Sequence, residues 1–398
     1  MLIRNAKDYN GKPVELWLRD GKIAAVGLGL LVPDGEEVLD AKGRTVLPAF
    51  IDTHCHWRTP GFEYKDDIAT GSAAAAAGGY TFVNLMPNTK PVCSSAAQAA
   101  MVEDEARKVG LCDANQTVSI TQNFDGKTID HLATLPDDIR FITEDGHGVM
   151  NNAVMARVFA LATERGLTVM SHAEDSDISP WDYRLAENIE TVRNCHLAEY
   201  YGTRLHMCHV STKEAVDAIR VSRMRGARVS CEVTPHHLWF DDSRLQYKVN
   251  PPIREEKDRL AVIEGLKDGT LDCIVTDHAP HHADDKNVEY DQAAFGISGL
   301  ETSFALSYTA LVKGGALSLE ELAKKMSSNP ARILNLEGGA LEVGAPADFT
   351  AVDLDEKWVI DPKDFVSKGK NTPFTGREVY GRVKYTVVDG EVKFQDQN

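Results

Sequence analysis

The middle of this chain repeats one unit, a helix-like segment that stops at a glycine and is followed by a short apolar run. Residues 152–166, "NAVMARVFALATERG", have helical spacing and precede the run "LTVMSH". Helix followed by strand, repeated along a chain, predicts parallel β/α units. Over roughly 290 residues this favours a (β/α)8 barrel of the TIM type in the α/β class. The absence of a G-x-G-x-x-G motif after a strand argues against a dinucleotide fold. Further apolar runs of this kind cover residues 80–88, 204–211, 227–237 and 271–282.

The two ends of the chain have a different pattern, in which short strand-like segments alternate with tight turns. The Asp-Gly pairs in "RDGK" and "VDGE" are hairpin signals, one near each end. We therefore expect residues 1–48 and 340–398 to meet in one small β-sandwich domain. Residues 49–339 are then expected to form the barrel.

The charge and the cysteines limit the partners and the location. The chain has 398 residues and a net charge of −17, which argues against nucleic acid or an anionic membrane as a partner. A small-molecule substrate is expected, and an anionic one needs a local basic pocket. Seven scattered cysteines without a C-x-x-C pair indicate reduced thiols. With no signal-peptide core and no membrane-spanning run, these features predict a cytoplasmic protein.

Several of the apolar runs end in side chains that bind metals. In a parallel barrel the C-terminal ends of all strands open on one face, so these side chains should converge. As isolated residues they would be ordinary core or loop groups, but that interpretation needs one coincidence for each strand. The strand-end residues are His54 and His56, Glu144 and Asp145, His172, His209, and Asp277 and His278.

The pair His54 and His56 indicates a metal site most directly. Alternate residues of a strand point the same way, so the two rings can share one metal, while Cys55 faces away. Imidazole and carboxylate ligands suit Zn²⁺ best. The sequence leaves open the roles of five other histidines, which are His147, His236, His237, His278 and His282. For His236 and His237 it favours a supporting role.

In combination these motifs resemble the amidohydrolase superfamily and, within it, the long-type dihydroorotases of bacteria and archaea. The resemblance implies zinc and the reversible cyclisation of N-carbamoyl-L-aspartate to L-dihydroorotate in pyrimidine synthesis. It implies two zinc ions per subunit, with one as the alternative, a homodimer, and a possible association with aspartate transcarbamoylase. The motifs are "DTHCHWRTPG", "MPN", "SHAED", "HVSTKEAV", "EVTPHH", "NPPIREEKDR", "TDHAPH" and "SKGKNTPFTG".

The resemblance also assigns metal ligands. Many relatives bridge their metals with a carboxylated lysine, but "RFITEDG" contains no lysine. Asp145, just before a glycine, matches the aspartate that takes this place in long-type dihydroorotases, and Glu144 is then expected to point aside. The other implied ligands are His54, His56 and Asp277 for the first metal, and His172 and His209 for the second.

The expected chemistry is the opening and closing of a cyclic amide. Metal ions activate water and polarise the carbonyl, and Asp277 would carry the proton between the water and the leaving nitrogen. Arg58, two residues after His56, is expected on the same strand face, where its forked donors suit the substrate carboxylate. The resemblance adds His56, Asn88 and His281 at the carboxylate, and Asn250, Phe295 and Gly296 at the ring amide.

Two other functions remain open. A hydantoinase or allantoinase also opens a cyclic amide, but such enzymes usually carry the bridging lysine that "FITED" lacks. A catalytically silent relative would act as a structural partner of aspartate transcarbamoylase. Silent relatives are expected to have lost metal ligands, whereas the matched positions here are filled.

Overall fold

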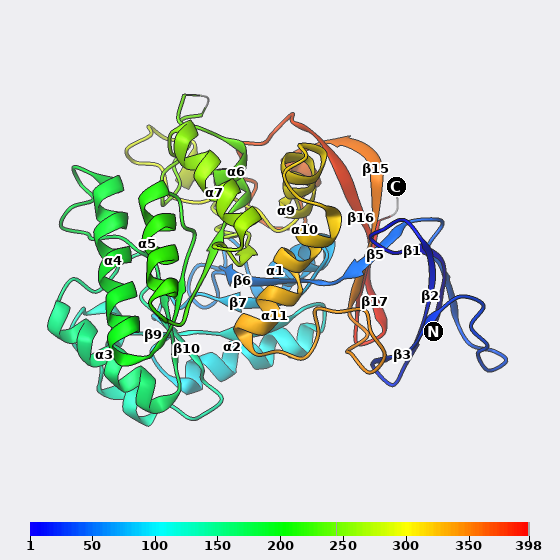
Figure 1. Ribbon diagram of the computed structural model, residues 1–398, viewed down its shortest axis with the longest axis horizontal. Helices are drawn as coiled ribbons and strands as arrows, with labels where there is room; N and C mark the ends of the chain where they lie inside the picture. Colours follow the sequence, from blue (N-terminus) through cyan, green and yellow to red (C-terminus); the bar gives the residue numbers. More distant parts are fainter. Residues whose placement is uncertain (244, 397–398) are drawn as a thin grey trace.

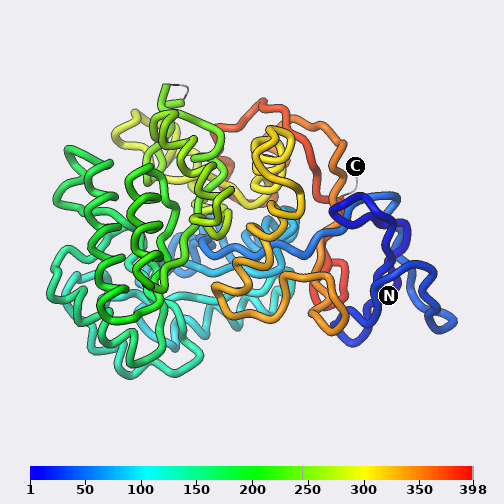
Figure 2. Tube along the Cα trace, in the orientation of Figure 1, coloured from blue at the N-terminus to red at the C-terminus, as the bar shows by residue number. Residues whose placement is uncertain are grey.

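The computed structural model describes residues 1–243 and 245–396, and two unlike parts lie along its long axis (Figure 1). Strands surrounded by helices occupy one part. The other part is a β sheet to which both ends of the chain contribute. In Figure 2 the blue N-terminal segment and the orange and red C-terminal segments lie together in this sheet.

The β domain is an eight-stranded sheet in the order β17-β16-β15-β5-β1-β2-β3, with β4 paired to β1. Antiparallel pairing of Leu47 with Thr350 joins β5 to β15 and so joins the two ends of the chain. Both expected Asp-Gly hairpins are present, between β2 and β3 and between β16 and β17. The strands are β1 Leu2–Lys7, β2 Pro13–Arg19, β3 Lys22–Gly27, β4 Val38–Asp40, β5 Thr45–Pro48, β15 Phe349–Val359, β16 Glu378–Val388 and β17 Glu391–Gln395.

The domain boundaries at residues 48 and 340 stay a prediction, and residues 397–398 lie outside the described part of the chain. β5 ends at Pro48, and β6 of the barrel begins two residues later at Phe50. The connection between the two parts is therefore short on this side.

The barrel strands run parallel in two sheets, in the orders β14-β13-β12-β11-β10-β9 and β6-β7-β8. Beyond β14, His278 makes one parallel bridge to Cys55 of β6 and another to Ile297. The segment after β14 is thereby connected to β6. Only Thr117 separates β8 from β9, so the strands form a closed ring. They are β6 Phe50–Cys55, β7 Tyr80–Leu85, β8 Asp113–Gln116, β9 Val118–Ser119, β10 Phe141–Thr143, β11 Thr168–Ser171, β12 Arg204–Met207, β13 Val229–Val233 and β14 Cys273–Ile274.

Helices cover the outside of this ring, and their ends follow the capping residues of the sequence. The Asn151 side chain accepts from the backbone N–H of Ala153 and Val154 at the start of α3, and Gly166 ends that helix at a φ of 69°. The helices are α1 Ile68–Ala77, α2 Ala96–Val109, α3 Asn152–Arg165, α4 Tyr183–Tyr201, α5 Lys213–Met224, α6 Pro235–Trp239, α7 Glu256–Asp268, α8 Ala283–Lys286, α9 Ser303–Ser307, α10 Leu319–Met326 and α11 Ser328–Leu334. The 3-10 helices are η1 Gln122–Phe124, η2 Asp130–Thr134 and η4 Pro362–Asp364, and η3 Tyr308–Lys313 is a π-helix.

The barrel strands end earlier than the apolar pattern predicts. β12 stops at Met207 and β14 at Ile274, so His209 and Asp277 lie in the loops beyond. Both residues have positive φ, 32° and 44°, a conformation that costs a non-glycine residue about 1–3 kcal/mol. Packing around the loops must hold them there, and such strain is concentrated at functional sites.

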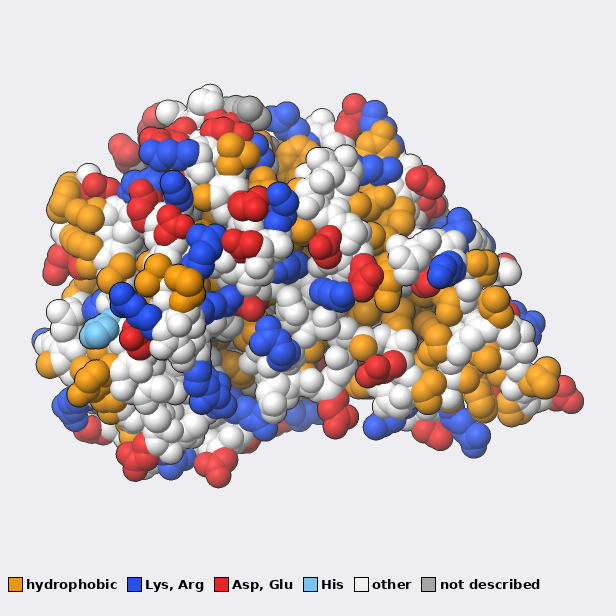
Figure 3. All heavy atoms as spheres, viewed as in Figure 1, with side chains coloured by type: hydrophobic (Ala, Val, Ile, Leu, Met, Phe, Trp, Pro, Cys, Tyr) orange, Lys and Arg blue, Asp and Glu red, His pale blue; other side chains and the backbone are white. Residues whose placement is uncertain are grey.

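The surface carries acidic and basic side chains side by side (Figure 3). Within residues 1–243 and 245–396 no helix combines the length and the apolar character needed to cross a membrane. All seven cysteines are buried and form no disulfide.

Candidate metal centre

Side chains at or beyond the ends of β6, β10, β11, β12 and β14 converge at the C-terminal end of the barrel. Each is at most 9% exposed, so the group is largely shielded from solvent. Buried imidazoles and carboxylates at such a density need partners, because an uncompensated charge is costly in the interior. The members are His54, His56, Asp145, His172, His209 and Asp277.

His54, His56 and Asp277 form one possible ligand group. Asp277 Oδ1 lies 3.3 Å from His56 Nε2 and 3.6 Å from His54 Nε2. Two atoms bound to one tetrahedral zinc at about 2.0–2.1 Å are about 3.3 Å apart. The spacing in this group therefore fits a shared ion.

Asp145 lies between this group and two further histidines. Its Oδ1 is 3.3 Å from His54 Nε2 and 3.6 Å from His172 Nδ1. His172 Nδ1 is in turn 2.9 Å from His209 Nε2. His54 Nε2 and Asp145 Oδ1 are buried and have no hydrogen-bond partner among the described residues. Buried nitrogen and oxygen atoms without a hydrogen-bond partner are suited to bind a metal ion. These residues therefore fit the implied ions.

Hydrogen bonds on the far sides of the rings set which nitrogen faces the centre. His54 Nδ1 lies 2.8 Å from Glu232 Oε1, and His56 Nδ1 lies 2.9 Å from Asn88 Oδ1. A proton on each Nδ1 leaves Nε2 free to bind a metal. Asn88 also donates from Nδ2 to Asp145 Oδ2 at 2.9 Å. Its amide therefore orients two candidate ligands at once.

His172 is oriented in the opposite sense. Its Nε2 lies 3.0 Å from Glu174 Oε2, so Nδ1 is the nitrogen that faces His209 and Asp145. Glu174 also accepts from Asn250 Nδ2 at 2.5 Å. The burial of Glu174 works to raise its pKa, but the His172 ring outweighs burial and lowers the pKa to about 2. Glu174 is therefore the ionised partner that ties His172 to Asn250.

The two aspartates of the cluster are held ionised. Burial works to raise the pKa of Asp145 and of Asp277, but the imidazoles around them, His54 foremost, hold both pKa values below the ordinary range. His209 is the opposite case, because burial and the neighbouring rings of His172 and His54 lower its pKa to about 3. A neutral imidazole beside carboxylates is the protonation state that binds metals.

The adjacent acid Glu144 points aside, as expected. Its carboxylate accepts from the backbone N–H of Thr121 at 2.8 Å and from the Thr121 hydroxyl. Burial raises the pKa of Glu144 to about 7. Of the two acids that follow β10, only Asp145 therefore faces the cluster.

A cavity of about 430 Å³ opens above these ligands. His54 lies beneath the cavity and is fully buried. The lining includes every other ligand candidate and all of the expected substrate contacts, namely Arg58, Asn88, Asn250, His281, Phe295 and Gly296.

Arg58 reaches this cavity by a different route from the one the sequence suggested. β6 ends at Cys55, and Arg58 has a φ of 60° in the turn that follows. The expectation that strand alternation places Arg58 beside His56 is therefore wrong. A backbone hydrogen bond fixes the side chain instead, because Nε donates to Pro280 O at 3.1 Å.

His281 connects Arg58 to the loop that carries Phe295. Arg58 NH2 lies 3.3 Å from His281 Nε2, which is 2.7 Å from Phe295 O. Lys65 Nζ is 3.2 Å from the other ring nitrogen. Burial and the charges of Arg58 and Lys65 lower the pKa of His281 to about 2. His281 is therefore neutral between two cations, of which Arg58 lines the cavity and offers a positive charge to an anionic substrate.

Gly296 is required by space as well as by backbone conformation. Its φ is 135°, and a Cβ added there would lie 2.5 Å from Ala279 Cβ. The Gly296 N–H donates to Lys248 O at 3.2 Å. This bond anchors the loop at the edge of the cavity.

The histidines that the sequence left open stand outside the ligand group. His237 bonds Thr234 and the carbonyl of Pro251, which follows Asn250. His278 Nε2 lies 3.1 Å from Asp66, and the His147 ring makes a tilted contact with the ring of Phe124. His236 is buried, and His282 is half exposed.

Sequence reasoning missed Glu232, Glu174 and Lys65. Glu232 is fully buried on β13 and also accepts from Thr53 and His206. A lone carboxylate inside the apolar run "VSCEV" was the available signal, because an unpaired charge is excluded from a strand core. Glu174, in the "SHAED" motif, and Lys65 carry no comparable signal in the sequence.

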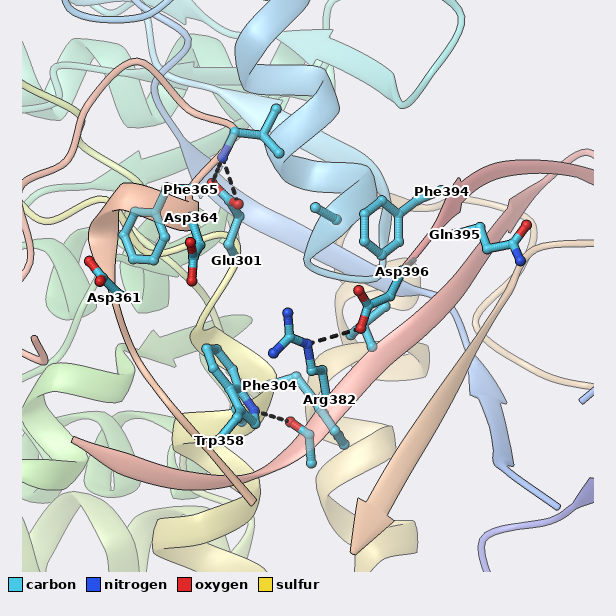
Figure 4. Close-up of a pocket in the computed structure, with 15 residues that line it drawn as sticks. Glu301, Phe304, Trp358, Asp361, Asp364, Phe365, Arg382, Phe394, Gln395 and Asp396 are labelled. Carbon is cyan, nitrogen blue, oxygen red and sulfur yellow. Dashed lines mark hydrogen bonds and ion pairs between the residues drawn. The ribbon is translucent and has the colours of Figure 1, made fainter. Parts of the chain in front are cut away.

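A second cavity, of about 600 Å³, lies where the β domain meets the barrel (Figure 4). Arg382 pairs there with Asp396 at 3.0 Å, and Trp358 lies beside them. On the facing side Glu301 accepts from the backbone N–H of Val366, and burial raises its pKa to about 7. Among the described residues that line this cavity there is no histidine or cysteine, so it lacks the imidazole ligands of the first site.

Comparison with known proteins places the chain in a family. A sequence profile of the amidohydrolase family matches residues 45–393. The dihydroorotase of Clostridium botulinum (strain Eklund 17B / Type B) is 43% identical over 403 residues, with 99% of both chains covered. This chain belongs to the dihydroorotases of the amidohydrolase family. The dihydroorotase of Desulforapulum autotrophicum is 44% identical and covers 96% of this chain and 95% of its own length.

Solved structures agree on the fold. The L-hydantoinase (dihydropyrimidinase) of Arthrobacter aurescens has a TM-score of 0.88 at 25% identity and covers 98% of this chain and 95% of its own. The dihydropyrimidinase of Brevibacillus agri NCHU1002 has a TM-score of 0.89 at 23% identity, covering 98% and 94%. The predicted α/β barrel with a terminal β domain is confirmed, as is the predicted family.

Proposed function

We propose that this chain is a zinc-dependent dihydroorotase, a cyclic amidohydrolase that interconverts N-carbamoyl-L-aspartate and L-dihydroorotate in pyrimidine synthesis. The observation that carries the proposal is the convergence of imidazoles and carboxylates below a cavity that also holds Arg58. Identity of 43% to a dihydroorotase over 99% of both chains supports the same substrate.

The ligand groups support two zinc ions per chain. Asp145 is the proposed bridge, because its Oδ1 lies 3.3 Å from His54 Nε2 and 3.6 Å from His172 Nδ1. A single ion is the alternative, and it would leave Asp145 on one metal. We assign the first ion to His54, His56 and Asp277, and the second to His172 and His209.

Asp277 is the proposed proton carrier. When bound, zinc lowers the pKa of water to about 7 and polarises a carbonyl. Asp277 Oδ1 lies 3.3 Å from His56 Nε2, and the residue lines the cavity. Because neighbouring imidazoles keep this carboxylate ionised, it can accept a proton during ring opening and return it during ring closure. One group then serves both directions.

Arg58 is the proposed anchor for the substrate carboxylate. The Pro280 carbonyl holds Nε at 3.1 Å, so the guanidinium has a fixed place at the cavity. Its planar donors match a carboxylate in geometry and charge. Asn88 and His281 line the same cavity and complete the proposed carboxylate site, with His56 beside them.

The ring amide is assigned to Asn250 and to the backbone at Phe295 and Gly296. All three line the cavity. Asn250 Nδ2 is engaged by Glu174, which leaves the amide oxygen for a ring N–H. The anchored Gly296 keeps the neighbouring Phe295 backbone at the cavity edge.

Turnover of three substrates by zinc-loaded protein tests this proposal. We expect ring opening of L-dihydroorotate, and far slower opening of hydantoin and allantoin. Exclusive turnover of hydantoin or allantoin would favour the alternative cyclic amidases. Protein that binds no zinc and turns over none of the three would favour the silent structural partner.

We also propose that the chain is cytoplasmic and forms a homodimer that can associate with aspartate transcarbamoylase. A row of apolar side chains on α4 supports contact with a second copy. Ile189, Val192 and Tyr200 are 42%, 57% and 73% exposed, and exposed apolar rows mark interaction surfaces. Light scattering with and without aspartate transcarbamoylase tests both assemblies.

A further inference from the structure

A cleft of about 320 Å³ lies at the end of the barrel opposite the metal centre. It is built where β11, β12 and β13 begin, whereas the candidate ligands follow the ends of β11 and β12. We call it the basal cleft and define it by the polar side chains that line it, which are Thr168, Arg204, Arg223, Arg228, Ser230, Asp272 and Arg332.

The basal cleft is strongly basic in a chain whose net charge is −17. Asp272 is the one acid among the residues that line it. Its Oδ1 is 3.2 Å from Arg332, and its Oδ2 pairs with Arg223. In the described part of the chain no carboxylate lies within ion-pair distance of Arg204 or Arg228. Two guanidinium charges therefore remain without an anion.

The arginines repel one another across this surface. Burial is the first cause that lowers the pKa of Arg204, and the charges of Arg228 and Arg140 add to it. Like charges held together cost free energy unless an anion lies between them. Figure 3 shows blue basic side chains gathered between the positions of α5 and α11, with few red acidic ones among them.

Hydrogen bonds hold the guanidinium groups of Arg223 and Arg204 before any ligand arrives. Arg223 donates from Nε to Val229 O at 2.7 Å and from NH1 to Gly269 O at 3.1 Å. Arg204 Nε donates to Thr168 Oγ1 at 3.2 Å. Preorganised cations lose less entropy on binding than free ones do. Arg223 and Arg204 are therefore held in place, whereas Arg228, which also lines the cleft, is exposed.

We propose that the basal cleft binds a small oligophosphate anion. Four arginines and one aspartate leave a net charge of +3. A monoanion would compensate only part of this charge, whereas linked phosphates supply several charges and accept forked hydrogen bonds from arginine. The cleft volume suits a diphosphate or the phosphate tail of a nucleotide. Inorganic pyrophosphate and nucleoside triphosphates share this chemistry.

Calorimetric titration of the full chain at low salt tests the proposal, with inorganic pyrophosphate and ATP as separate probes. Wild type should bind pyrophosphate, ATP or both, and added salt should weaken binding. The double variant R204Q/R228Q should bind about 100-fold more weakly, at about tenfold for each charge-assisted contact. Tighter binding of ATP supports a nucleotide as the natural ligand, and equal binding supports an inorganic one.

The matched control is R19Q/R107Q, which removes the same charge from two exposed arginines outside the cleft. It should bind as wild type does. Loss of metal to the phosphate probes would affect both double variants equally, so the difference between them reports the cleft. R228Q alone should weaken binding about tenfold if the double variant fails to fold. No binding by wild type, or equal affinity in R204Q/R228Q, overturns the proposal.

Discussion

Glu232 Oε1 lies 2.8 Å from His54 Nδ1, and this buried pair supports the metal centre from below. His206 Nε2 lies 2.7 Å from the other carboxylate oxygen of Glu232. Ser230, which lines the basal cleft, lies 2.8 Å from His206 Nδ1. A continuous row of hydrogen bonds therefore runs through the barrel interior to a candidate ligand.

Replacing Glu232 with glutamine should loosen metal binding without unfolding the protein. The amide cannot hold the His54 ring as a carboxylate does, and loss of such a partner costs about 10- to 100-fold in metal affinity. Competition with a chelator measures the affinity, and circular dichroism checks the fold. Glu103→Gln is the control, because Glu103 lies on helix α2 and accepts from the backbone N–H of Gln116. Equal affinities in the two variants would show that Glu232 does not support the metal.

Asp145→Asn should remove the second metal and leave the first. Asp145 is the side chain placed between the His54 and His172 sides of the cluster. Without its charge, His172 and His209 lack an anionic partner for a second ion. Elemental analysis should then give one zinc per chain instead of two.

Glu144→Gln is the matched control, because the carboxylate next to Asp145 contacts Thr121 and not the cluster. It should keep the zinc content of wild type. Unchanged zinc content in Asp145→Asn would refute the bridge.

Arg58→Gln should weaken dihydroorotate binding more than it slows the chemistry. Loss of a charge-assisted contact to a carboxylate costs about 10- to 100-fold, so KM should rise by about this factor. Dihydrouracil has the same ring without the carboxylate, and its turnover should respond little. An equal loss of activity on both substrates would show that Arg58 has a structural role and does not bind the carboxylate. The exposed Arg107 provides a control substitution, Arg107→Gln.

Glu301→Gln should alter the pH dependence of stability and not the activity. Burial raises the pKa of Glu301 from 4.5 to about 7. Its favourable contribution is therefore complete below about pH 4.5 and is lost as the pH rises through 7. A glutamine stays neutral, so the variant should gain about 1–3 kcal/mol relative to wild type between pH 5 and pH 8. Thermal melts at both pH values measure this, and a constant difference in Tm would contradict it.

The parts of the fold that local chemistry determines could be predicted from the sequence. Asn151 and Gly166 mark the ends of α3 because a side-chain cap and a left-handed glycine are local needs. His172 follows β11 directly, so its place at the barrel mouth follows from strand direction alone. The convergence of the candidate ligands was predictable for the same reason.

The parts set by contacts between distant segments could not be predicted. Arg58 depends on the Pro280 carbonyl, 222 residues away in sequence. Glu232 meets His54 across 178 residues. The pairing of Asn88 with both His56 and Asp145 likewise appears only once three loops are brought together. The spacing of residues within one segment does not predict contacts between segments that are far apart in the sequence.

The most direct test of the central claim is L-dihydroorotate ring opening by one preparation before and after zinc removal. We expect turnover by the zinc-loaded protein, loss of turnover after chelation, and recovery when zinc is restored. The reverse reaction, from N-carbamoyl-L-aspartate, should follow the same pattern. A zinc-loaded and folded protein that leaves dihydroorotate intact would contradict the proposed function.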